Sequence, residues 1–328
     1  MIYFNDIDRE IFEKHLHIDC DELVIISGYL GPNPILNLAS LPIKSSVIYG
    51  MYTSDGIAPK LHSTLLNVHN SSVNVDIMYS KIVVHSKCYI WLKASDIVHA
   101  LVGSANFSSS GLSKPYKEVL SEVFSSAYPN LKSYINYVMS NSLICTSSSV
   151  RTSVARSRRI STIRSAFGKC SVSLLDLSLG VVPFRSGLNW GMTNLTGSHT
   201  NIDDAYIPIL KEYIRSHPEL FPPKSKTPRS HVSTGRRQRH NEAIDIIWDD
   251  GTTMVGLLEG TQKDNGVDYP KQIASHPQKK ILGQYIRNRL GVPSGVPITT
   301  NHLNAYGRNN IEISLLSDDV YYFDFSKP

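Results

Sequence analysis

The stretch that decides the fold is residues 85–118, which read HSKCYIWLKASDIVHALVGSANFSSSGLSKPYKE. Residues 89–92 and 97–101 are rich in aromatic, β-branched and aliphatic side chains, and four residues separate the two runs. This pattern predicts two neighbouring strands of one sheet joined by a turn. Side chains alternate between the faces of a strand, so His85 and Lys87 are expected to point the same way.

The polar residues around these strands indicate phosphate chemistry. An imidazole and an ammonium on one face make a place for a phosphate. Gly103 and Ser104 let the backbone approach closely, and Asn106 adds a neutral donor. An isolated HxK tripeptide is common by chance, and its histidine is then more often a half-buried strand residue of no consequence. An HxK followed at this distance by GSxN is much rarer, which favours the functional reading.

The HxK motif at 85–87 and the GSxN motif at 103–106 together resemble the catalytic motif of the phospholipase D superfamily. The distance from His to Asn is close to that of its short nuclease members. Its lipases carry an Asp five residues after the Lys, where this chain has Leu92. Its nucleases carry a Glu after the Asn that orients the His. Glu118 is the best positional match and Glu122 is the alternative.

Length and composition set broad limits. A chain of 328 residues with 41% hydrophobic content is long enough for two domains with real cores. No apolar run reaches the length of a membrane span, and the polar, partly acidic first ten residues are unlike a signal peptide. The four cysteines form no CxxC pair, which argues against a zinc site or a disulfide framework. We therefore expect a cytoplasmic protein without a membrane partner.

The positive charge gathers in two places. Residues 151–170 contain five arginines and a lysine with no acid, and residues 224–242 contain six basic residues against Glu242 alone. Basic runs of this kind are often only solvated loops. Two of them beside a phosphate-chemistry motif favour a nucleic acid partner.

The two halves of the chain differ in pattern. In the first, buried strands are expected at 23–26, 47–52 and 73–78 and helices at 6–17, 58–68 and 131–138. This alternation predicts an α/β catalytic domain over residues 1–145. Residues 146–179 are rich in serine and arginine and read as a linker. Residues 180–328 predict a mostly-β barrel or sandwich, with a hairpin turn at the DDG sequence of 249–251 and one clear helix at 281–290.

Several stretches are similar to NgoFVII-type restriction endonucleases. They are IISGY at 25–29, LNWG at 188–191, DAYIP at 204–208, the 281–290 helix, YGR at 306–308 and YFDFS at 322–326. The resemblance implies a phospholipase D-like nuclease domain followed by a B3-like pseudobarrel. In that family the pseudobarrel holds double-stranded DNA with two arms in the major groove.

Base reading needs Arg or Lys for guanine, Asn or Gln for adenine, and Asp or Glu for cytosine. Two segments are candidates for the arms. The first is the loop 189–204, which offers Asn189, Asn194, Asn201 and Asp203. The second is the stretch 262–289, which offers Gln262, Lys271, Gln272, Arg287 and Arg289. For more than half of these residues we expect a solvated side chain instead. Arg236, Arg237 and Arg239 are expected to contact phosphates, which position DNA without reading its sequence.

The resemblance also implies a metal-independent, covalent mechanism. His85 would attack phosphorus to form a phosphohistidine, while Lys87 and Asn106 stabilise the phosphoryl oxygens and Ser104 is a further candidate donor. Glu118 would accept a hydrogen bond from the other ring nitrogen of His85. The chain holds one HxK followed by GSxN. The imidazole that protonates the departing 3′ oxygen is therefore expected from a second copy, in a homodimer with one composite site.

The sequence thus predicts a type II-like restriction endonuclease that cleaves double-stranded DNA at or near a specific sequence. One alternative is a lipid or phosphodiester hydrolase of the phospholipase D type, which needs the missing Asp and usually a second HxK. The other is a non-catalytic DNA-binding protein in which the motif only clamps phosphate. The chain has no GxxxxGK[ST] loop, so any use of ATP requires a separate ATPase or helicase subunit. The sequence leaves open that subunit, a companion methyltransferase and the recognition site.

Overall fold

A computed structural model describes residues 1–113, 116–152, 168–193, 200–224 and 241–328. The chain forms two compact units, made mainly of residues 1–164 and 165–328. Each unit has its own sheet and its own hydrophobic core.

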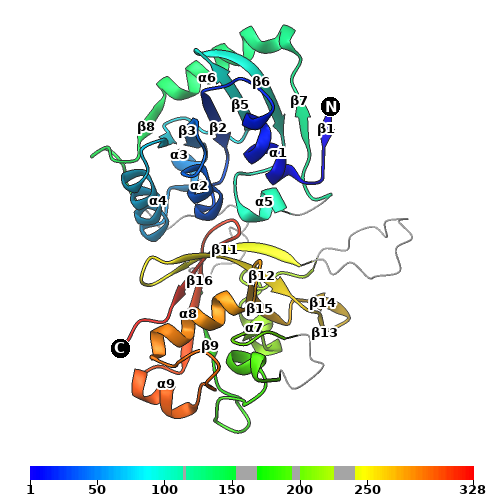
Figure 1. Cartoon of the computed structure of the whole chain (residues 1–328), viewed down its shortest axis with the longest axis vertical. Helices are drawn as coiled ribbons and strands as arrows, with labels where there is room; N and C mark the ends of the chain where they lie inside the picture. Colours follow the sequence, from blue (N-terminus) through cyan, green and yellow to red (C-terminus); the bar gives the residue numbers. More distant parts are fainter. Residues whose placement is uncertain (114–115, 153–167, 194–199, 225–240) are drawn as a thin grey trace. The chain divides into compact units, whose positions relative to one another are not determined.

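The first unit is a mixed α/β layer built on an eight-stranded sheet (Figure 1). Its elements are β1 (Ile2–Tyr3), α1 (Ile7–Glu13), η1 (Lys14–Leu16), β2 (Glu22–Ser27), α2 (Pro32–Leu38), β3 (Lys44–Tyr49), α3 (Tyr52–Asp55), α4 (Pro59–Ser71), β4 (Val75–Ser80), β5 (Lys87–Lys93), β6 (Asp96–Gly103), α5 (Ser109–Ser113), β7 (Leu120–Glu122), η2 (Ser125–Ala127), α6 (Tyr128–Ser140) and β8 (Ser142–Ile144). The strand order is β1-β7-β6-β5-β2-β3-β4-β8. Strands β2, β3 and β4 are parallel, and the other neighbours pair antiparallel.

The central strand β2 is buried on both faces, which explains its continuous apolar sequence. Val24 and Ile26 belong to a core cluster that includes Ile135 and Val138 of α6, so α6 covers that face of the sheet. Leu23 and Ile25 alternate with them along β2, are equally buried and point to the other face of the sheet. Connections between parallel strands are right-handed, which puts α2 and α4 together on one side of the sheet.

The hairpin predicted within residues 85–118 is confirmed. Strands β5 and β6 pair antiparallel, with Lys87 opposite Gly103 and Lys93 opposite Asp96. The two turn residues, Ala94 and Ser95, have positive φ values of 47° and 73°, as a tight hairpin turn requires. The strand expected at 47–52 lies three residues earlier in the chain: β3 spans Lys44–Tyr49, and α3 already begins at Tyr52.

The second unit is mostly β, with a curved seven-stranded sheet. Its elements are β9 (Cys170–Ser173), η4 (Gly187–Thr193), β10 (Ile207–Pro208), α7 (Lys211–Ser216), β11 (Glu242–Trp248), β12 (Thr253–Glu259), β13 (Gln262–Asp264), β14 (Val267–Tyr269), β15 (Gln272–Ser275), α8 (Lys280–Leu290), α9 (Thr300–Tyr306), β16 (Asn310–Ser317) and β17 (Val320–Asp324). The strand order is β10-β15-β12-β11-β17-β16-β9, and β13 pairs with β14 in a separate hairpin. The sheet is barrel-like, as predicted for this half of the chain.

The core of the second unit is large and rich in aromatic side chains. Trp248 packs edge-on against Phe323 at a centroid distance of 5.2 Å and lies 4.5 Å from Tyr285 of α8. The predicted hairpin turn lies between β11 and β12, where Gly251 takes a φ of 87°. The predicted helix is α8, which ends at Gly291 in the left-handed region.

One segment that the sequence assigns to the linker belongs to this sheet. Residues 170–173, within the predicted linker 146–179, form the edge strand β9, which pairs antiparallel with β16. Cys170 and Val172 are each 1% exposed and join the core of the second unit. Because these alternate side chains are buried in that core, residues 170–173 form a strand of the second unit and not part of a linker.

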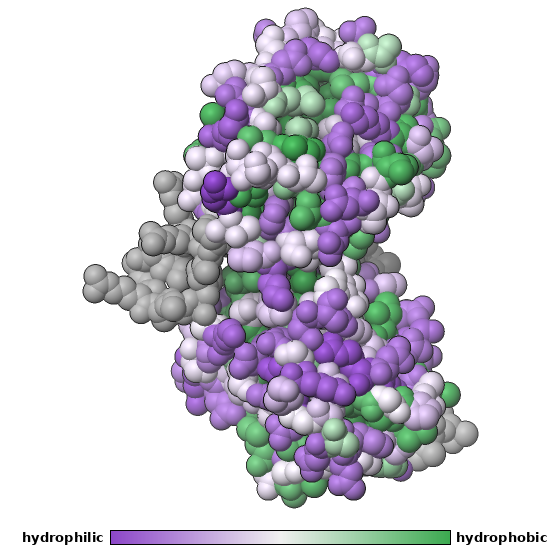
Figure 2. All heavy atoms as spheres, turned by 90° about the vertical axis from the view of Figure 1, so that its left-hand side faces the viewer, coloured by the Kyte–Doolittle hydropathy of each residue, from purple (hydrophilic) through white to green (hydrophobic). Residues whose placement is uncertain are grey.

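The surface of the chain is predominantly polar on the face that Figure 2 presents, with hydrophobic residues in small groups. Within the described residues, no helix has both the length and the apolar character needed to cross a bilayer.

Candidate active site

His85 and Lys87 come together where β5 begins. Ile26 at the end of β2 pairs with Cys88, so the HxK motif lies beside the carboxyl end of a central strand. In open α/β sheets this is where ligands bind. Nζ of Lys87 lies 3.1 Å from Nδ1 and 3.3 Å from Nε2 of His85 and donates to the His85 carbonyl oxygen at 2.7 Å. Lys87 is buried, whereas His85 precedes the strand and is exposed.

Asn106 completes the group from the loop after β6. A β-carbon added to Gly28 would lie 3.1 Å from Cδ2 of His85, 3.2 Å from Nζ of Lys87 and 3.4 Å from Oδ1 of Asn106. Three side chains from two segments of the sequence therefore surround a single point of the backbone. The absence of a side chain at Gly28 makes room for them.

The side-chain amide of Asn106 has a defined orientation. Its Oδ1 atom accepts a hydrogen bond from the backbone N–H of Tyr29 at 3.2 Å and lies 3.5 Å from Oγ of Ser27. Ser27 Oγ in turn accepts from the backbone N–H of Phe107 at 2.9 Å. With its oxygen held in this way, the amide has its NH₂ group to offer to an anion.

Electrostatics favour a neutral imidazole beside a cation. Desolvation by the surrounding protein and then the Lys87 ammonium lower the pKa of His85 from its ordinary value. Burial also lowers the pKa of Lys87, and the Glu118 carboxylate opposes that change. A neutral ring nitrogen is the form of histidine that can act as a nucleophile.

The remaining predicted residues of the motif occupy different positions. Ser104 is exposed, and its Oγ accepts a hydrogen bond from the backbone N–H of Val119 at 3.0 Å, so it fixes the loop that carries Glu118. Glu118 is half-buried and acts on the charge of Lys87. Glu122 is engaged elsewhere: Oε2 accepts from the N-terminal ammonium at 2.8 Å, and Oε1 lies 3.5 Å from Nδ1 of His99. Glu122 is therefore the weaker candidate for orienting His85.

Sequence reasoning missed the residues that support this group. Ser27, Gly28 and Tyr29 lie within IISGY, which pointed to the family but was not assigned to the site. The available signal was a Ser-Gly pair at the end of a buried strand, where the backbone approaches a ligand. The described residues contain no group of three or more His, Cys, Asp or Glu side chains arranged to hold a metal ion.

In the second unit, three predicted DNA contacts are buried. Asn189 is 0% exposed, and its side-chain amide bonds Pro183 and Ile298 through their backbone groups. Asp203 and Arg287 are 0% and 1% exposed and form an ion pair at 2.9 Å between Oδ1 and Nε. These side chains are buried inside the second unit, so a base cannot reach them in this conformation.

Three more predicted contacts are occupied within the protein. Gln272 is buried and donates to Glu259 of the neighbouring strand β12. Gln262 Nε2 donates to two backbone carbonyls, at 2.7 and 2.9 Å. The Arg289 guanidinium pairs with Asp249 at 2.8 Å and donates to the backbone carbonyl of Phe325 at 2.9 Å. Because these side chains already bind partners within the protein, most residues of the second predicted arm are not available to contact DNA.

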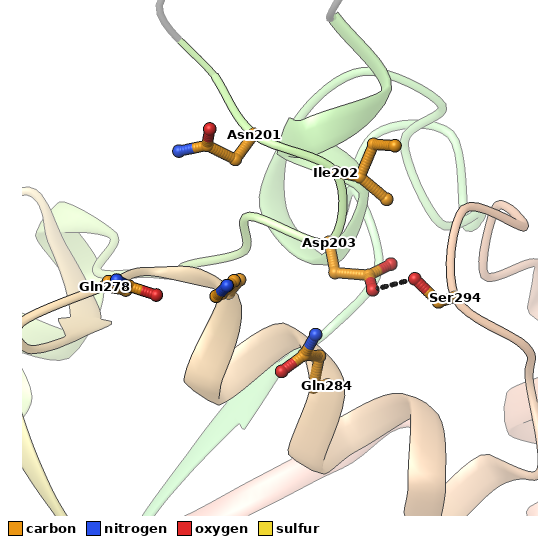
Figure 3. A pocket seen from close by; sticks show the side chains of 7 residues that line it. Asn201, Ile202, Asp203, Gln278, Gln284 and Ser294 are labelled. Atoms are coloured by element: carbon orange, nitrogen blue, oxygen red, sulfur yellow. Dashed lines mark hydrogen bonds between the residues drawn. The ribbon is translucent and has the colours of Figure 1, made fainter.

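Asn201 and Lys271 are exposed, as a DNA contact needs to be. Asn201 lines an open depression of about 530 Å³, together with Ile202, Asp203, Gln278, Lys280, Gln284 and Ser294. Figure 3 shows that the side chains lining this depression come from the 201–203 segment, from α8 and the turn before it, and from the loop after α8. Ser294 donates to Asp203, as the dashed line marks. Asn194, Arg236, Arg237 and Arg239 lie outside the described residues.

Comparisons with known proteins match both halves of the chain. The model for the NgoFVII restriction endonuclease N-terminal PLD domain matches residues 5–152, and that for the NgoFVII C-terminal B3-like DNA-binding domain matches residues 165–317. No curated protein matches the sequence. Among solved structures, NucT from Helicobacter pylori is 17% identical, covers 44% of this chain and 97% of its own, and gives a TM-score of 0.33. Polyphosphate kinase from Porphyromonas gingivalis is 14% identical, with coverages of 46% and 24% and a TM-score of 0.26.

The two family models follow one another in the order of the two units, and together they span most of the sequence. The α/β unit with the His85 group carries the nuclease match, and the barrel-like unit carries the DNA-binding match. The chain therefore belongs to the NgoFVII restriction endonuclease family: it is a nuclease that acts on DNA, with a phospholipase D-like domain followed by a B3-like DNA-binding domain.

Proposed function

We propose that this protein is a type II-like restriction endonuclease that hydrolyses phosphodiester bonds of double-stranded DNA through a phosphohistidine at His85, without a metal ion. The observation that carries the proposal is the convergence of His85, Lys87 and Asn106 around Gly28. It supplies a nucleophile, a cation and an amide donor to one phosphoryl group. These are the groups that covalent phosphoryl transfer needs for attack and for charge stabilisation.

The reaction is proposed in two steps. In the first, a ring nitrogen of His85 attacks phosphorus, the bond from phosphorus to the 3′ oxygen breaks, and an imidazolium protonates that oxygen. In the second, water attacks the phosphorus of the phosphohistidine, the bond from phosphorus to the His85 nitrogen breaks, and the imidazole that gave its proton accepts one from the water. Lys87 and the NH₂ group of Asn106 stabilise the negative charge on the phosphoryl oxygens in both steps. Glu118 is proposed to orient His85, with Ser104 holding its loop.

The acid in this scheme is proposed to come from a second copy of the chain. The sequence holds one HxK followed by GSxN, and the mechanism uses two imidazoles. A two-fold homodimer that joins two His85 groups provides both in one composite site. Such a site would cut the two DNA strands one after the other.

Sequence recognition is proposed to lie in the second unit. Asn201 and Lys271 are the described candidates that remain accessible, and the depression adds Gln278 and Gln284, whose carboxamides suit adenine. Arg236, Arg237 and Arg239 stay proposed phosphate contacts. If Gln284 reads a base, Gln284→Ala costs about 1–3 kcal/mol of discrimination at one position of the site. Selection of cleaved sites from a random library would measure that change.

The test is digestion of a plasmid library in excess EDTA, followed by end sequencing. We expect cleavage at defined sites, its loss with His85→Ala, and unchanged cleavage with His17→Ala, which alters an exposed histidine before β2. Acid quenching of the reaction on ³²P-labelled DNA should trap an acid-labile phosphoenzyme. Cleavage only with an added divalent ion, or undiminished cleavage by His85→Ala, would refute the proposal. DNA binding without cleavage by the native protein would favour a phosphate clamp.

A further inference from the structure

The backbone segment that holds Asn106 also carries a side chain against His85. Tyr29 follows Gly28 at the end of β2, and its backbone N–H donates to Oδ1 of Asn106 at 3.2 Å. Its ring lies 6.0 Å from the His85 ring, centroid to centroid, at an interplanar angle of 82°. This is the edge-to-face arrangement that aromatic pairs prefer. One residue therefore contacts both the proposed nucleophile and the proposed amide donor.

The Tyr29 ring is itself anchored to a buried carboxylate. Its hydroxyl donates to Oδ2 of Asp55 at 2.5 Å, and Asp55 is only 5% exposed. The other carboxylate oxygen accepts from Oγ of Ser54 at 2.8 Å. A buried carboxylate needs such partners, because an uncompensated charge in the interior is costly. Hydrogen bonds to charged groups are also stronger than neutral ones, so this contact fixes the ring well.

The neighbouring backbone restricts Tyr29 further. Ser27 Oγ donates to the Tyr29 carbonyl oxygen at 2.6 Å, and the Tyr49 ring packs 6.3 Å from the Tyr29 ring. His85 has less support of its own, because it is exposed and precedes the first residue of β5. An imidazole on a loop end can rotate unless a neighbouring group limits it. Among the described residues, Tyr29 is the aromatic side chain that packs against the His85 ring.

We propose that Tyr29, anchored by Asp55, is a positioning residue that holds the His85 imidazole and the Asn106 amide in the geometry for attack on phosphorus. The inference rests on the proposed function of His85. Tyr29 touches neither the phosphoryl group nor the leaving oxygen in this scheme. Its contribution is to restrict two groups that do.

The test compares ring loss with hydroxyl loss. Tyr29→Leu removes the ring and should lower the single-turnover rate of DNA cleavage about 10²-fold, the size of effect that misplacing a reacting group produces. Tyr29→Phe keeps the ring and should lower this rate only about tenfold, because one hydrogen bond is lost. DNA affinity should change less than about twofold in both variants, since the DNA-binding unit is separate. Tyr137→Leu, which removes an exposed tyrosine of α6, is the matched control.

A double-mutant cycle tests the role of Asp55. If the hydroxyl acts through this carboxylate, Tyr29→Phe, Asp55→Ala and the double variant should all lower the cleavage rate by the same factor. The effects of the two single substitutions should not multiply in the double variant. Asp55→Asn keeps an acceptor oxygen and should recover most of the activity if Asp55→Ala proves unstable. Selectively ¹⁵N-labelled histidine gives an independent readout: the His85 ring signals should shift or broaden in Tyr29→Leu and stay unchanged in Tyr137→Leu.

Two outcomes would overturn the inference. One is a Tyr29→Leu protein that cleaves at the native rate. The other is multiplicative losses in the cycle with native His85 ring signals. Both can be seen only if the native protein cleaves DNA in a His85-dependent manner. If it does not, the proposed function itself has failed, so the two failures are distinguishable.

Discussion

Nζ of Lys87 lies 3.1 Å from Nδ1 of His85 and donates at 2.7 Å to the carbonyl oxygen of the same residue. The hydrogen bond to the His85 backbone therefore holds the Lys87 ammonium beside the His85 imidazole. Its charge disfavours a second positive charge on the ring and favours an anion in front of both. One contact thus prepares a nucleophile and a phosphate site together.

This contact makes the ionisation of His85 depend on Lys87. Desolvation and the ammonium lower the pKa of His85 below its ordinary value of 6.5, so the ring stays neutral to lower pH than a free histidine. In Lys87→Met the charge is gone and the pKa of His85 should rise toward 6.5. A histidine NMR titration measures the change directly, with the exposed Lys81→Met as control. A pKa that falls or stays constant in Lys87→Met would contradict this account.

Gly28 should be intolerant of even one methyl group. A β-carbon there meets atoms of His85, Lys87 and Asn106 at 3.1–3.4 Å, so at least one of the three must move. We expect Gly28→Ala to lower the cleavage rate about 10²-fold with little change in the thermal midpoint, because the displacement is local. Single-turnover cleavage and thermal denaturation together check this. Native activity would mean that the three groups need not converge there.

Glu118 and Glu122, the two glutamates near the motif, should differ in how much their substitution lowers the cleavage rate. Glu118→Gln removes the carboxylate next to Lys87 and should lower cleavage about 10²-fold through a misplaced or wrongly protonated His85. Glu122→Gln alters the contacts with His99 and the N-terminal ammonium and should leave the cleavage rate within a small factor of native. Cleavage rates of the two purified variants decide the matter. The reverse ranking would identify Glu122 as the orienting acid.

Arg287 should matter for stability rather than for base reading. Its guanidinium is 1% exposed and pairs with the fully buried Asp203. Arg287→Met leaves a buried carboxylate without its cation and should lower the free energy of unfolding by about 3–5 kcal/mol. Urea denaturation monitored by tryptophan fluorescence measures the loss. A stable Arg287→Met protein with altered sequence preference would restore Arg287 as a DNA contact.

Local patterns gave much of the secondary structure. The hairpin around 93–96, the turn at Gly251 and the helix α8 could be predicted, because each depends on residues adjacent in sequence. The HxK and GSxN motifs pointed to the His85 group for the same reason. The supporting contacts of Tyr29 with Asp55 and Asn106 could not be predicted, because they join residues 26 and 77 positions apart.

The DNA-contact candidates illustrate the opposite limit. Asn189, Asp203 and Arg287 have side chains that suit base reading, and their residue types and spacing alone do not distinguish a reader from a buried partner. The tertiary structure separates the two cases, because folding places Asn189 against backbone groups and Asp203 against Arg287.

The sequence by itself determined the kinds of chemistry available: a histidine, a lysine and an asparagine at the spacing of a phosphodiesterase motif, within strands fixed by local apolar patterns. Only the tertiary structure decided that they surround Gly28, that Tyr29 touches two of them, and which polar residues are buried. The physical reason is that residue type fixes what a group can donate, accept or attack. Packing between distant segments fixes whether that group is free, oriented and close enough to do so.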